Sequence, residues 1–492
     1  MLAWGSFYRK AIVTLGLAGL VMGAAPAPAP YPTMLRLERA RSLGSGQLAA
    51  YLASADEPIA VRAALAIGRT KQPAGVALLE AHLRDPRDAV KAMSIYGLGL
   101  IASGSDAPAL VSALRDPSGA VRVAAVDALG RYEAAKRLPD PSAAAQALLQ
   151  TLVADADPIV QSRAAIALEL FRAEASAPSI AAGLERAVEA RNAPAVRRDA
   201  MWSLFRGYAD RLPITFLRTA LRDRDDVVRI EAVRAIGKRK RAGERPLLLP
   251  MLNDPSWRVQ EQAGESLRAI AGKPFTADWK AIPASVHLPA LSADPLAALP
   301  ALPRTIAPGK PKAPSVAGVP NAPLLDPRTA AQMTQPAPGM HPRVRIVTTK
   351  GNVYVTLFPE WAPLTVANFL NVAAHGYYDN NRWFRIVPDF VVQTGDPNDD
   401  GNGDAGYTIG AEENPLAQGT GVISMGMNYD SKTNTPLRDS AGTQYYVTLS
   451  PQYHLDRDFT VFGQVTSGFD VLAHLVESDR VIRVERIADV RL

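Results

Sequence analysis

The feature that most constrains the fold is a short pattern that recurs at intervals of 29 to 39 residues between residues 35 and 272. Each copy has a turn, most often Asp-Pro, then a valine, usually followed by a basic residue, and then an alanine-rich apolar run. The valines of the seven copies are Val61, Val90, Val121, Val160, Val196, Val228 and Val259. Self-similarity at this period indicates a solenoid, in which each repeat packs against its neighbours.

Each copy fits a pair of helices. In the third copy Asp116 is expected to cap a helix that begins at Pro117, where the missing N–H carries no cost. Apolar residues at positions i, i+3, i+4, i+7 and i+8 from Val121 form one stripe, which we expect to end at Gly130. A preceding helix is expected over residues 107–114. The pattern resembles HEAT-type repeats, which implies an all-α HEAT-like solenoid of about seven repeats over 35–272; the alternative is a non-repetitive helical domain.

Solenoids of this kind usually bind partners along a long surface rather than catalyse a reaction. We therefore expect a protein partner or client on residues 35–272. Residues 238–241, Lys-Arg-Lys-Arg, follow one repeat. We interpret them as a solvated loop, and an anion or partner site is the alternative.

The first residues have the order of a targeting signal. Arg9 and Lys10 precede an apolar stretch at 11–25, which is shorter than the ~20 residues of a membrane span. We predict a signal peptide at 1–25 and an extended proline-rich spacer at 26–34, with an uncleaved membrane anchor as the alternative. No later run approaches 18 apolar residues, so no membrane span is expected after the signal segment. The sequence thus predicts an exported protein, periplasmic or secreted, for which nucleic acid is not an expected partner.

A proline-rich linker separates the repeats from a second domain. We place it at 273–342, because residues 283–342 hold 14 prolines with few charges and no periodicity. The net charge also changes across it, from +12 for residues 1–342 to −6 for residues 343–492. Cysteine is absent, which excludes disulfides and a cysteine nucleophile.

Residues 343–492 contain many short apolar runs and few helical patterns. A hairpin is expected from two runs that flank Gly351, and helices are expected to begin at Pro363 and to cover 469–476. Short strands with two helices favour a closed antiparallel barrel.

The motifs of this domain resemble those of cyclophilin-type peptidyl-prolyl cis-trans isomerases. They are residues 382–397 (RWFRIVPDFVVQTGDP), 365–369 (TVANF), 376–378 (GYY), 442–446 (GTQYY) and 461–463 (VFG). The resemblance spans 343–492 and implies an eight-stranded barrel with two helices, a proline-binding groove and isomerase (rotamase) activity. It also implies proline-containing polypeptide clients.

Rotation about an X–Pro bond is slow because amide resonance sets a barrier of about 18–20 kcal/mol. A fixed guanidinium can weaken the conjugation by donating to the prolyl nitrogen, whose lone pair is available only when the amide is twisted. The resemblance assigns the catalytic roles to Arg385, Phe390 and Gln393. It assigns substrate binding to Phe384, Met425, Met427, Asn428, Gln444, Tyr446, His454, Leu455 and Phe459.

Four of these residues depart from the usual family pattern. Phe384 stands for a histidine, His454 for a tryptophan, Tyr446 for a phenylalanine and Phe459 for a histidine. These changes keep the pocket apolar or aromatic, so activity is expected. An insertion at 429–438 is expected to fold over the groove and to narrow its specificity.

No metal or cofactor is expected. Residues 396–401 fit the start of a calcium loop, but Tyr407 stands where the closing glutamate belongs. The six histidines form no metal spacing. We therefore predict an exported folding helper, chaperone-like, in which the solenoid holds clients and the barrel isomerises X–Pro bonds. The alternative is a non-catalytic scaffold whose barrel only binds proline-containing segments, its own linker among them.

Overall fold

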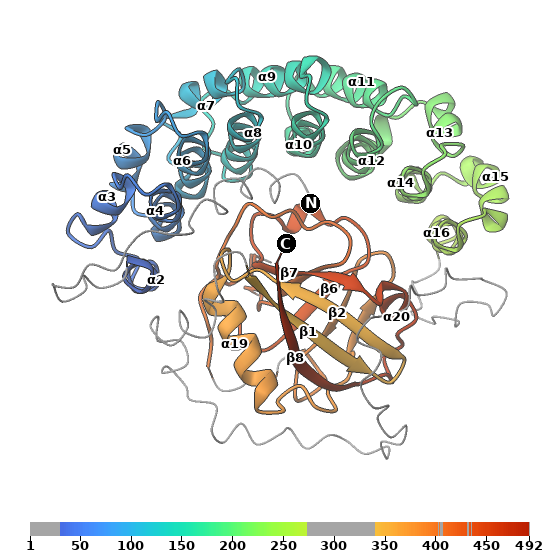
Figure 1. Cartoon of the computed structure of the whole chain (residues 1–492). Helices are drawn as coiled ribbons and strands as arrows, with labels where there is room; N and C mark the ends of the chain where they lie inside the picture. Colours follow the sequence, from blue (N-terminus) through green and yellow to red (C-terminus); the bar gives the residue numbers. More distant parts are fainter. Residues whose placement is uncertain are drawn as a thin grey trace. The chain divides into compact units, whose positions relative to one another are not determined.

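The computed structural model describes residues 30–272, 340–401, 403, 407–430, 432–433 and 435–491. The predicted signal peptide and almost all of the predicted linker lie outside these residues, so both stay predictions. The chain forms two compact units, one helical and one built around a sheet (Figure 1). No helix in the described ranges is long and apolar enough to cross a membrane.

Residues 40–272 form seven helix pairs stacked in sequence order, with one helix of each pair on the inner layer and one on the outer layer of an arc (Figure 1). The outer helices are α3 (Gln47–Leu52), α5 (Gly75–Glu80), α7 (Ala107–Ala113), α9 (Pro141–Ala154), α11 (Ala177–Ala187), α13 (Ile214–Ala220) and α15 (Arg245–Leu248). The inner helices are α4 (Glu57–Thr70), α6 (Asp88–Ile101), α8 (Gly119–Ala134), α10 (Pro158–Leu168), α12 (Pro194–Ser203), α14 (Asp226–Arg239) and α16 (Trp257–Ile270). The predicted HEAT-like solenoid is confirmed.

Three local expectations for α8 are wrong. The helix begins at Gly119 and not at Pro117. Asp116 does not cap it, because its carboxylate accepts from the Ser118 N–H (2.9 Å) and from the Lys91 ammonium of the preceding repeat (2.8 Å). The helix also continues past Gly130 to Ala134, because Gly130 packs against the next inner helix rather than ending its own.

The solenoid core is built from close backbone contacts. A Cβ atom on Gly68 of α4 would lie 2.6 Å from the Cα atom of Gly97 on α6, closer than any side chain can be placed. Alanines of the inner helices, such as Ala64 and Ala125, are completely buried. At such points neighbouring helices touch almost at their backbones, and a larger side chain has no room there.

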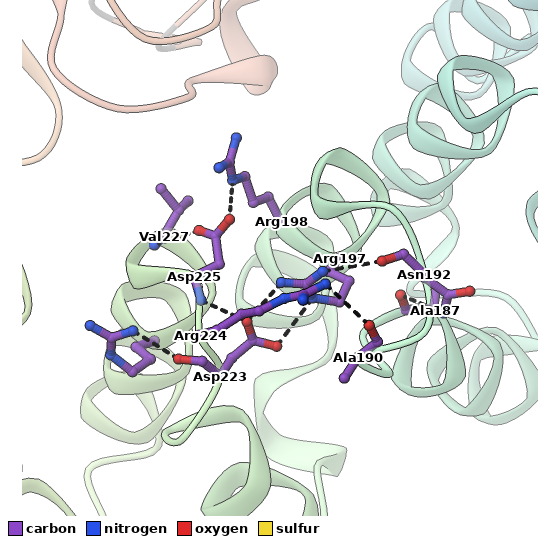
Figure 2. Close-up of polar contacts among 10 residues, drawn as sticks. Ala187, Ala190, Asn192, Arg197, Arg198, Asp223, Arg224, Asp225 and Val227 are labelled. Carbon is purple, nitrogen blue, oxygen red and sulfur yellow. Dashed lines mark hydrogen bonds and ion pairs between the residues drawn. The ribbon is translucent and has the colours of Figure 1, made fainter.

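Ion pairs join successive repeats and explain the basic residue that follows the repeat valine. Each reaches an aspartate in the turn of the next repeat. The pairs are Lys91–Asp116 (2.8 Å), Arg122–Asp155 (2.7 Å), Arg197–Asp223 (2.9 Å) and Arg229–Asp254 (2.7 Å). Figure 2 shows the Arg197–Asp223 pair beside a second one, between Arg198 and Asp225. Because each pair crosses a repeat boundary, it fixes the stacking of one repeat on the next.

The basic run at 238–241 also contacts the preceding repeat. The Lys238 ammonium donates to the carbonyl oxygens of Phe205 (3.2 Å) and Arg206 (2.5 Å). The Arg239 guanidinium donates to Leu212 O (2.7 Å), and that of Arg241 to Asp210 O (3.2 Å). Lys238, Lys240 and Arg241 are exposed, as expected for a solvated segment, but residues 238 and 239 belong to the end of α14 rather than to a loop.

The second unit is a curled antiparallel sheet of eight strands in the order β3-β4-β6-β5-β7-β2-β1-β8. The strands are β1 (Met340–Thr348), β2 (Gly351–Leu357), β3 (Arg385–Val387), β4 (Val391–Thr394), β5 (Val422–Met425), β6 (Tyr445–Thr448), β7 (Val461–Ser467) and β8 (Val481–Arg491). Two α-helices, α19 (Pro363–Ala374) and α20 (Phe469–Ala473), lie between these strands in the sequence. The predicted eight-stranded cyclophilin-like fold with two helices is confirmed.

The two end strands of the sheet are linked by a short bridge rather than by a full ladder. Arg382, just before β3, pairs with Arg480, just before β8. The Trp383 N–H donates to Asp479 O (3.1 Å), and the Asn380 N–H donates to Val481 O (2.7 Å). These bonds bring the ends of the curled sheet together.

Aromatic rings fill the interior of the sheet unit. The Phe369 ring of α19 lies 5.3 Å from those of Tyr378 and Phe462 and 5.4 Å from that of Tyr445, between centroids. All four side chains are fully buried. Burial raises the pKa of Tyr445 far above its usual value, so its phenol stays neutral.

A short helix, α2 (Pro30–Arg39), differs from the extended spacer predicted for 26–34. Prolines at positions 30 and 32 lie in its first turn, where the missing N–H groups have no helical partner. The Tyr31 hydroxyl donates to Pro359 O (3.2 Å), and Leu35 is buried against Leu364 and Ala367 of α19. By its contacts α2 belongs to the sheet unit.

Candidate active site

The predicted catalytic residues come from two paired strands. Arg385 begins β3 and lies directly opposite Gln393 of β4 in the register. Phe390 lies in the turn between them. The antiparallel pairing places a guanidinium and an amide on the same face of the sheet, because directly opposed residues point to the same side.

A chain of hydrogen bonds holds Arg385 in place. Its Nη1 donates to Gln393 Oε1 (3.1 Å), and Gln393 Nε2 donates to Gln444 Oε1 (3.0 Å). Gln444 Nε2 in turn donates to the carbonyl oxygens of Gly401 and Gly403, each at 3.0 Å. Each amide is held at both ends, so the orientation of Gln393 toward Arg385 is fixed by backbone atoms.

The Arg385 guanidinium also lies over an aromatic ring. Its Cζ atom is 5.4 Å from the centroid of Phe390, within the range of a cation–π contact. Loss of water around the guanidinium lowers the pKa of Arg385, although the side chain reaches the surface. An arginine stays protonated in proteins, so the site presents a charged, weakly hydrated donor.

An apolar cluster lies beside this arginine. Four buried side chains form it, and two half-buried ones pack against them. The buried members are Val391, Tyr446, Leu455 and Phe459, and the half-buried ones are Phe390 and Met427. We call these six residues the pocket cluster. Five of them were predicted from the resemblance, and the structure brings all five together.

The residues that depart from the family pattern take part in these contacts. The His454 ring stacks on Phe390, with centroids 5.9 Å apart and planes at 16°. The Tyr446 and Phe459 rings meet edge to face at 5.7 Å. Phe384 is half-buried outside the pocket cluster, and its ring lies next to Gly401.

Two predicted residues lie elsewhere. Met425 is completely buried in the interior of the sheet unit, among residues that include Tyr445. Asn428 is exposed, and its backbone is engaged by the insertion: its N–H donates to Ser440 Oγ and its carbonyl accepts from Leu437, each at 2.8 Å. Neither side chain belongs to the pocket cluster.

Val391 belongs to the pocket cluster although the family motifs did not predict it. It lies two positions before Gln393 on β4, so both side chains point to the same face of the strand. Strand alternation alone would have assigned it to the groove once Gln393 was placed there.

The insertion at 429–438 forms a small hairpin at the edge of the pocket cluster. Tyr429 pairs with Pro436 across it, and the Asp430 carboxylate accepts from two backbone N–H groups of the turn. Arg438 anchors its end by ion pairs to Glu413 and to Asp458 (3.5 Å for the second).

This hairpin places an additional aromatic ring at the edge of the pocket cluster. The Tyr429 ring lies 6.2 Å from that of Phe459, and 48% of the residue is exposed. Burial raises the pKa of the Tyr429 phenol, against an opposing effect of Arg385. Tyr429 is therefore a neutral phenol within electrostatic reach of the arginine.

The calcium-like sequence at 396–401 has a structural role. The buried Asp396 carboxylate accepts from the N–H groups of Asn398 (2.8 Å), Asp400 (3.0 Å) and Gly401. It thereby shapes the loop whose Gly401 carbonyl holds Gln444. Across the described residues, no group of three or more His, Asp or Glu side chains could hold a metal ion.

A guanidinium held by an amide chain beside a cluster of aromatic and aliphatic side chains on an antiparallel sheet is the arrangement expected of a cyclophilin-type isomerase. The family description "Cyclophilin type peptidyl-prolyl cis-trans isomerase" matches residues 343–491, and that of HEAT repeats matches 46–130, 78–169 and 214–279.

Two curated relatives carry the same activity in their names. Peptidyl-prolyl cis-trans isomerase B of Bacillus subtilis is 39% identical over 133 residues, which are 26% of this chain and 87% of that protein. The peptidyl-prolyl cis-trans isomerase of Synechococcus elongatus is 33% identical over 144 residues, 29% of this chain and 94% of that protein. A crystal structure of a cyclophilin-type isomerase from Cryptosporidium parvum is 26% identical and covers 30% of this chain and 98% of its own, with a TM-score of 0.28. The chain belongs to the cyclophilin family of peptidyl-prolyl cis-trans isomerases, with HEAT repeats N-terminal to that domain.

Proposed function

We propose that this protein is an exported folding helper in which the cyclophilin-type domain isomerises X–Pro bonds of client polypeptides that the solenoid holds. The observation that carries the catalytic part is the position of Arg385, bonded to Gln393 and lying over Phe390 at the edge of the pocket cluster. The basic and apolar order of residues 1–25 supports export, and the stacked repeats support partner binding.

The chemistry follows from the arrangement of these groups. The pocket cluster offers an apolar surface to the proline ring, which needs no hydrogen bonds. In a planar amide the prolyl nitrogen lone pair is delocalised and accepts poorly, whereas in the twisted amide it is localised. A guanidinium N–H aimed at that nitrogen therefore stabilises the transition state more than the ground state. Each 1.36 kcal/mol of this difference gives a tenfold increase in rate.

The hydrogen bonds from Arg385 to Gln393 and from Gln393 to Gln444 orient the Arg385 guanidinium before substrate binds. Gln393 accepts one guanidinium N–H and cannot rotate freely, because its Nε2 donates to Gln444. The Gln444 amide is held in turn by the carbonyls of Gly401 and Gly403. Pre-organised dipoles cost no reorganisation during the reaction. Both amides are neutral, so no proton has to leave or enter the site.

We further propose that Tyr429 selects among substrates. Its exposed ring extends the aromatic surface beyond Phe459, so a side chain next to the bound proline meets it on entering the groove. Large apolar or aromatic neighbours of proline gain contact area there, while small ones gain little.

The test of catalysis is the isomerisation rate of a proline-containing peptide, measured by exchange spectroscopy on the full chain. Arg385→Ala should lower kcat/KM by about 100- to 1,000-fold, as expected for loss of one pre-organised donor. Arg486→Ala is the matched control, because Arg486 pairs with Asp489 on β8 outside the site. Its rate should equal that of the parent.

The same experiment decides between catalysis and mere binding. The stacking of His454 on Phe390 favours the rival function, a domain that binds proline segments without isomerising them, because it covers one wall of the pocket. If the parent chain binds the peptide but isomerises it no faster than the Arg385→Ala variant does, the domain only binds proline segments and the catalytic proposal fails.

A further inference from the structure

The positive charge of the solenoid is concentrated in one stretch. Residues 201–250 hold 12 Lys and Arg against 6 Asp and Glu, whereas the rest of residues 35–272 holds 22 against 21. The excess therefore belongs to the helices around α12, α13 and α14.

A π-helical segment, η2 (Leu204–Tyr208), continues α12 and presents cations on aromatic rings. The Arg206 guanidinium lies over Trp202, with Cζ 5.8 Å from the ring centroid. The Phe205 ring carries two cations from α14, the Lys238 ammonium at 5.5 Å and the Arg234 guanidinium at 5.8 Å. Aromatic faces attract cations and hold them with little motion.

The nearby carboxylates are already committed to other arginines. Glu169 of η1 (Glu169–Phe171) pairs with Arg172 at 2.8 Å, and Glu231 of α14 pairs with Arg234 at 3.0 Å. Among the described residues, no carboxylate or carbonyl oxygen lies within hydrogen-bond distance of the half-buried Arg206 guanidinium.

The charges of this group do not cancel. We call Trp202, Phe205, Arg172, Arg206, Arg234 and Lys238 the cation–aromatic cluster. Its four cations interact with the carboxylates of Glu169 and Glu231, and Asp210 also acts on Lys238, which leaves an excess of one positive charge. Desolvation, with repulsion from neighbouring cations, lowers the pKa values of Arg206 and Lys238. An added negative group would offset the repulsion and stabilise the protonated forms of both side chains.

We propose that the cation–aromatic cluster binds a carboxylate side chain of an acidic polypeptide segment, with Arg206 as the principal contact. A guanidinium offers two parallel N–H donors that match the two oxygens of a carboxylate. Because Arg206 is half-buried against Trp202, the ligand must reach it with a projecting side chain, which an aspartate or glutamate of a peptide supplies. A flat membrane surface would contact the exposed arginines of residues 201–250 before it could reach the half-buried Arg206.

This inference names the partner of the solenoid, so it rests on the partner-binding role proposed above and is independent of the isomerase site. The test uses the full chain and two labelled synthetic peptides, one with regularly spaced glutamates and one with glutamine at the same positions. Binding is measured by fluorescence anisotropy at low and at physiological salt. Anionic phosphatidylglycerol vesicles and inorganic phosphate are the competing probes.

The acidic peptide should bind, and Arg206→Gln should weaken that binding by about 10-fold or more, as expected for a charge-assisted contact. Arg206→Lys should retain part of the affinity, because it keeps the charge but loses the paired donors. Arg115→Gln is the matched control, since Arg115 is an exposed solenoid arginine outside residues 201–250, and it should bind like the parent. Thermal unfolding of each variant shows whether the solenoid remains folded.

Four outcomes overturn this inference. If Arg206→Gln binds the acidic peptide as the parent does, or if both peptides bind equally, the cluster is not a carboxylate site. If Arg206 affects binding to vesicles or phosphate but not to the acidic peptide, the ligand is not a polypeptide. If neither peptide binds at all, the partner-binding role fails along with the inference, while the isomerase assay still stands.

Discussion

The two units of this protein reach a packed interior by opposite means. The solenoid brings backbones together through glycine and alanine, as where Gly68 meets Gly97, and joins its repeats with ion pairs at their boundaries. The sheet unit surrounds large rings, among them Phe369 and Tyr445, with strands. The glycine contacts of the solenoid leave no space for an added side chain, whereas the centre of the sheet unit depends on a few large rings. We therefore expect the solenoid to be destabilised by substitutions that add side-chain volume at its glycines. The sheet unit should be destabilised by substitutions that remove side-chain volume from its rings.

The largest effect is expected from removing a ring of the sheet unit. Phe369→Ala takes away contacts to three aromatic neighbours and leaves a cavity, which should lower the free energy of unfolding by about 3–5 kcal/mol. The near-ultraviolet circular dichroism of the aromatic rings should be lost at a lower temperature. The helical signal of the solenoid should melt as in the parent, and a joint shift of both signals would contradict the independence of the two interiors.

A smaller effect is expected from adding a single methyl group to the solenoid. The Cβ atom introduced by Gly68→Ala would meet the backbone of Gly97 at 2.6 Å, so the helices α4 and α6 must move apart. We expect a loss of about 1–3 kcal/mol, although alanine is the better helix former. The matched control is Gly264→Ala in α16, where only the flexible end of Arg268 is nearby, and which should stabilise slightly. If both variants melt alike, close packing is not what limits the solenoid.

The smallest effect concerns a surface residue that belongs to neither interior. Tyr429→Ala should raise KM by a few-fold for peptides with a large apolar residue beside proline, because one aromatic contact is worth about 1 kcal/mol. The value of kcat should stay the same, since Arg385 and Gln393 are not altered. Peptides with alanine beside proline should show no change, and an equal loss for both kinds of peptide would remove Tyr429 from substrate selection.

The sequence predicted the architecture of both units better than it predicted their local boundaries. Seven valines marked seven helix pairs, because each repeat needs the same stripe in the same place. Gly130 was expected to end a helix and instead lies within one, because its lack of a side chain serves packing against the next repeat. Asp116 was expected to cap a helix and instead binds Lys91 of another repeat. Such choices depend on neighbours that are remote in sequence.

The candidate site shows the same division. The identity of Arg385, Phe390 and Gln393 follows from a motif contained within 16 residues, and the structure brings these side chains together. The interior position of Met425 follows from the curvature of the sheet, which no local pattern encodes. The contact between the Tyr429 and Phe459 rings forms only when the hairpin at 429–438 folds against the pocket cluster. No local sequence pattern predicts that contact.

The packing of α2 on α19 has a consequence for how the chain is made. Tyr31 and Pro359, which are hydrogen-bonded, lie 328 residues apart. A ribosome adds about 5–20 residues per second, so α2 emerges tens of seconds before its binding surface exists. During that interval each repeat can already pack against the one before it, because its contacts are local. The helix α2, although it is made first among the described elements, is therefore among the last to dock. It can pack on α19 only after the ribosome has synthesised the whole solenoid and α19.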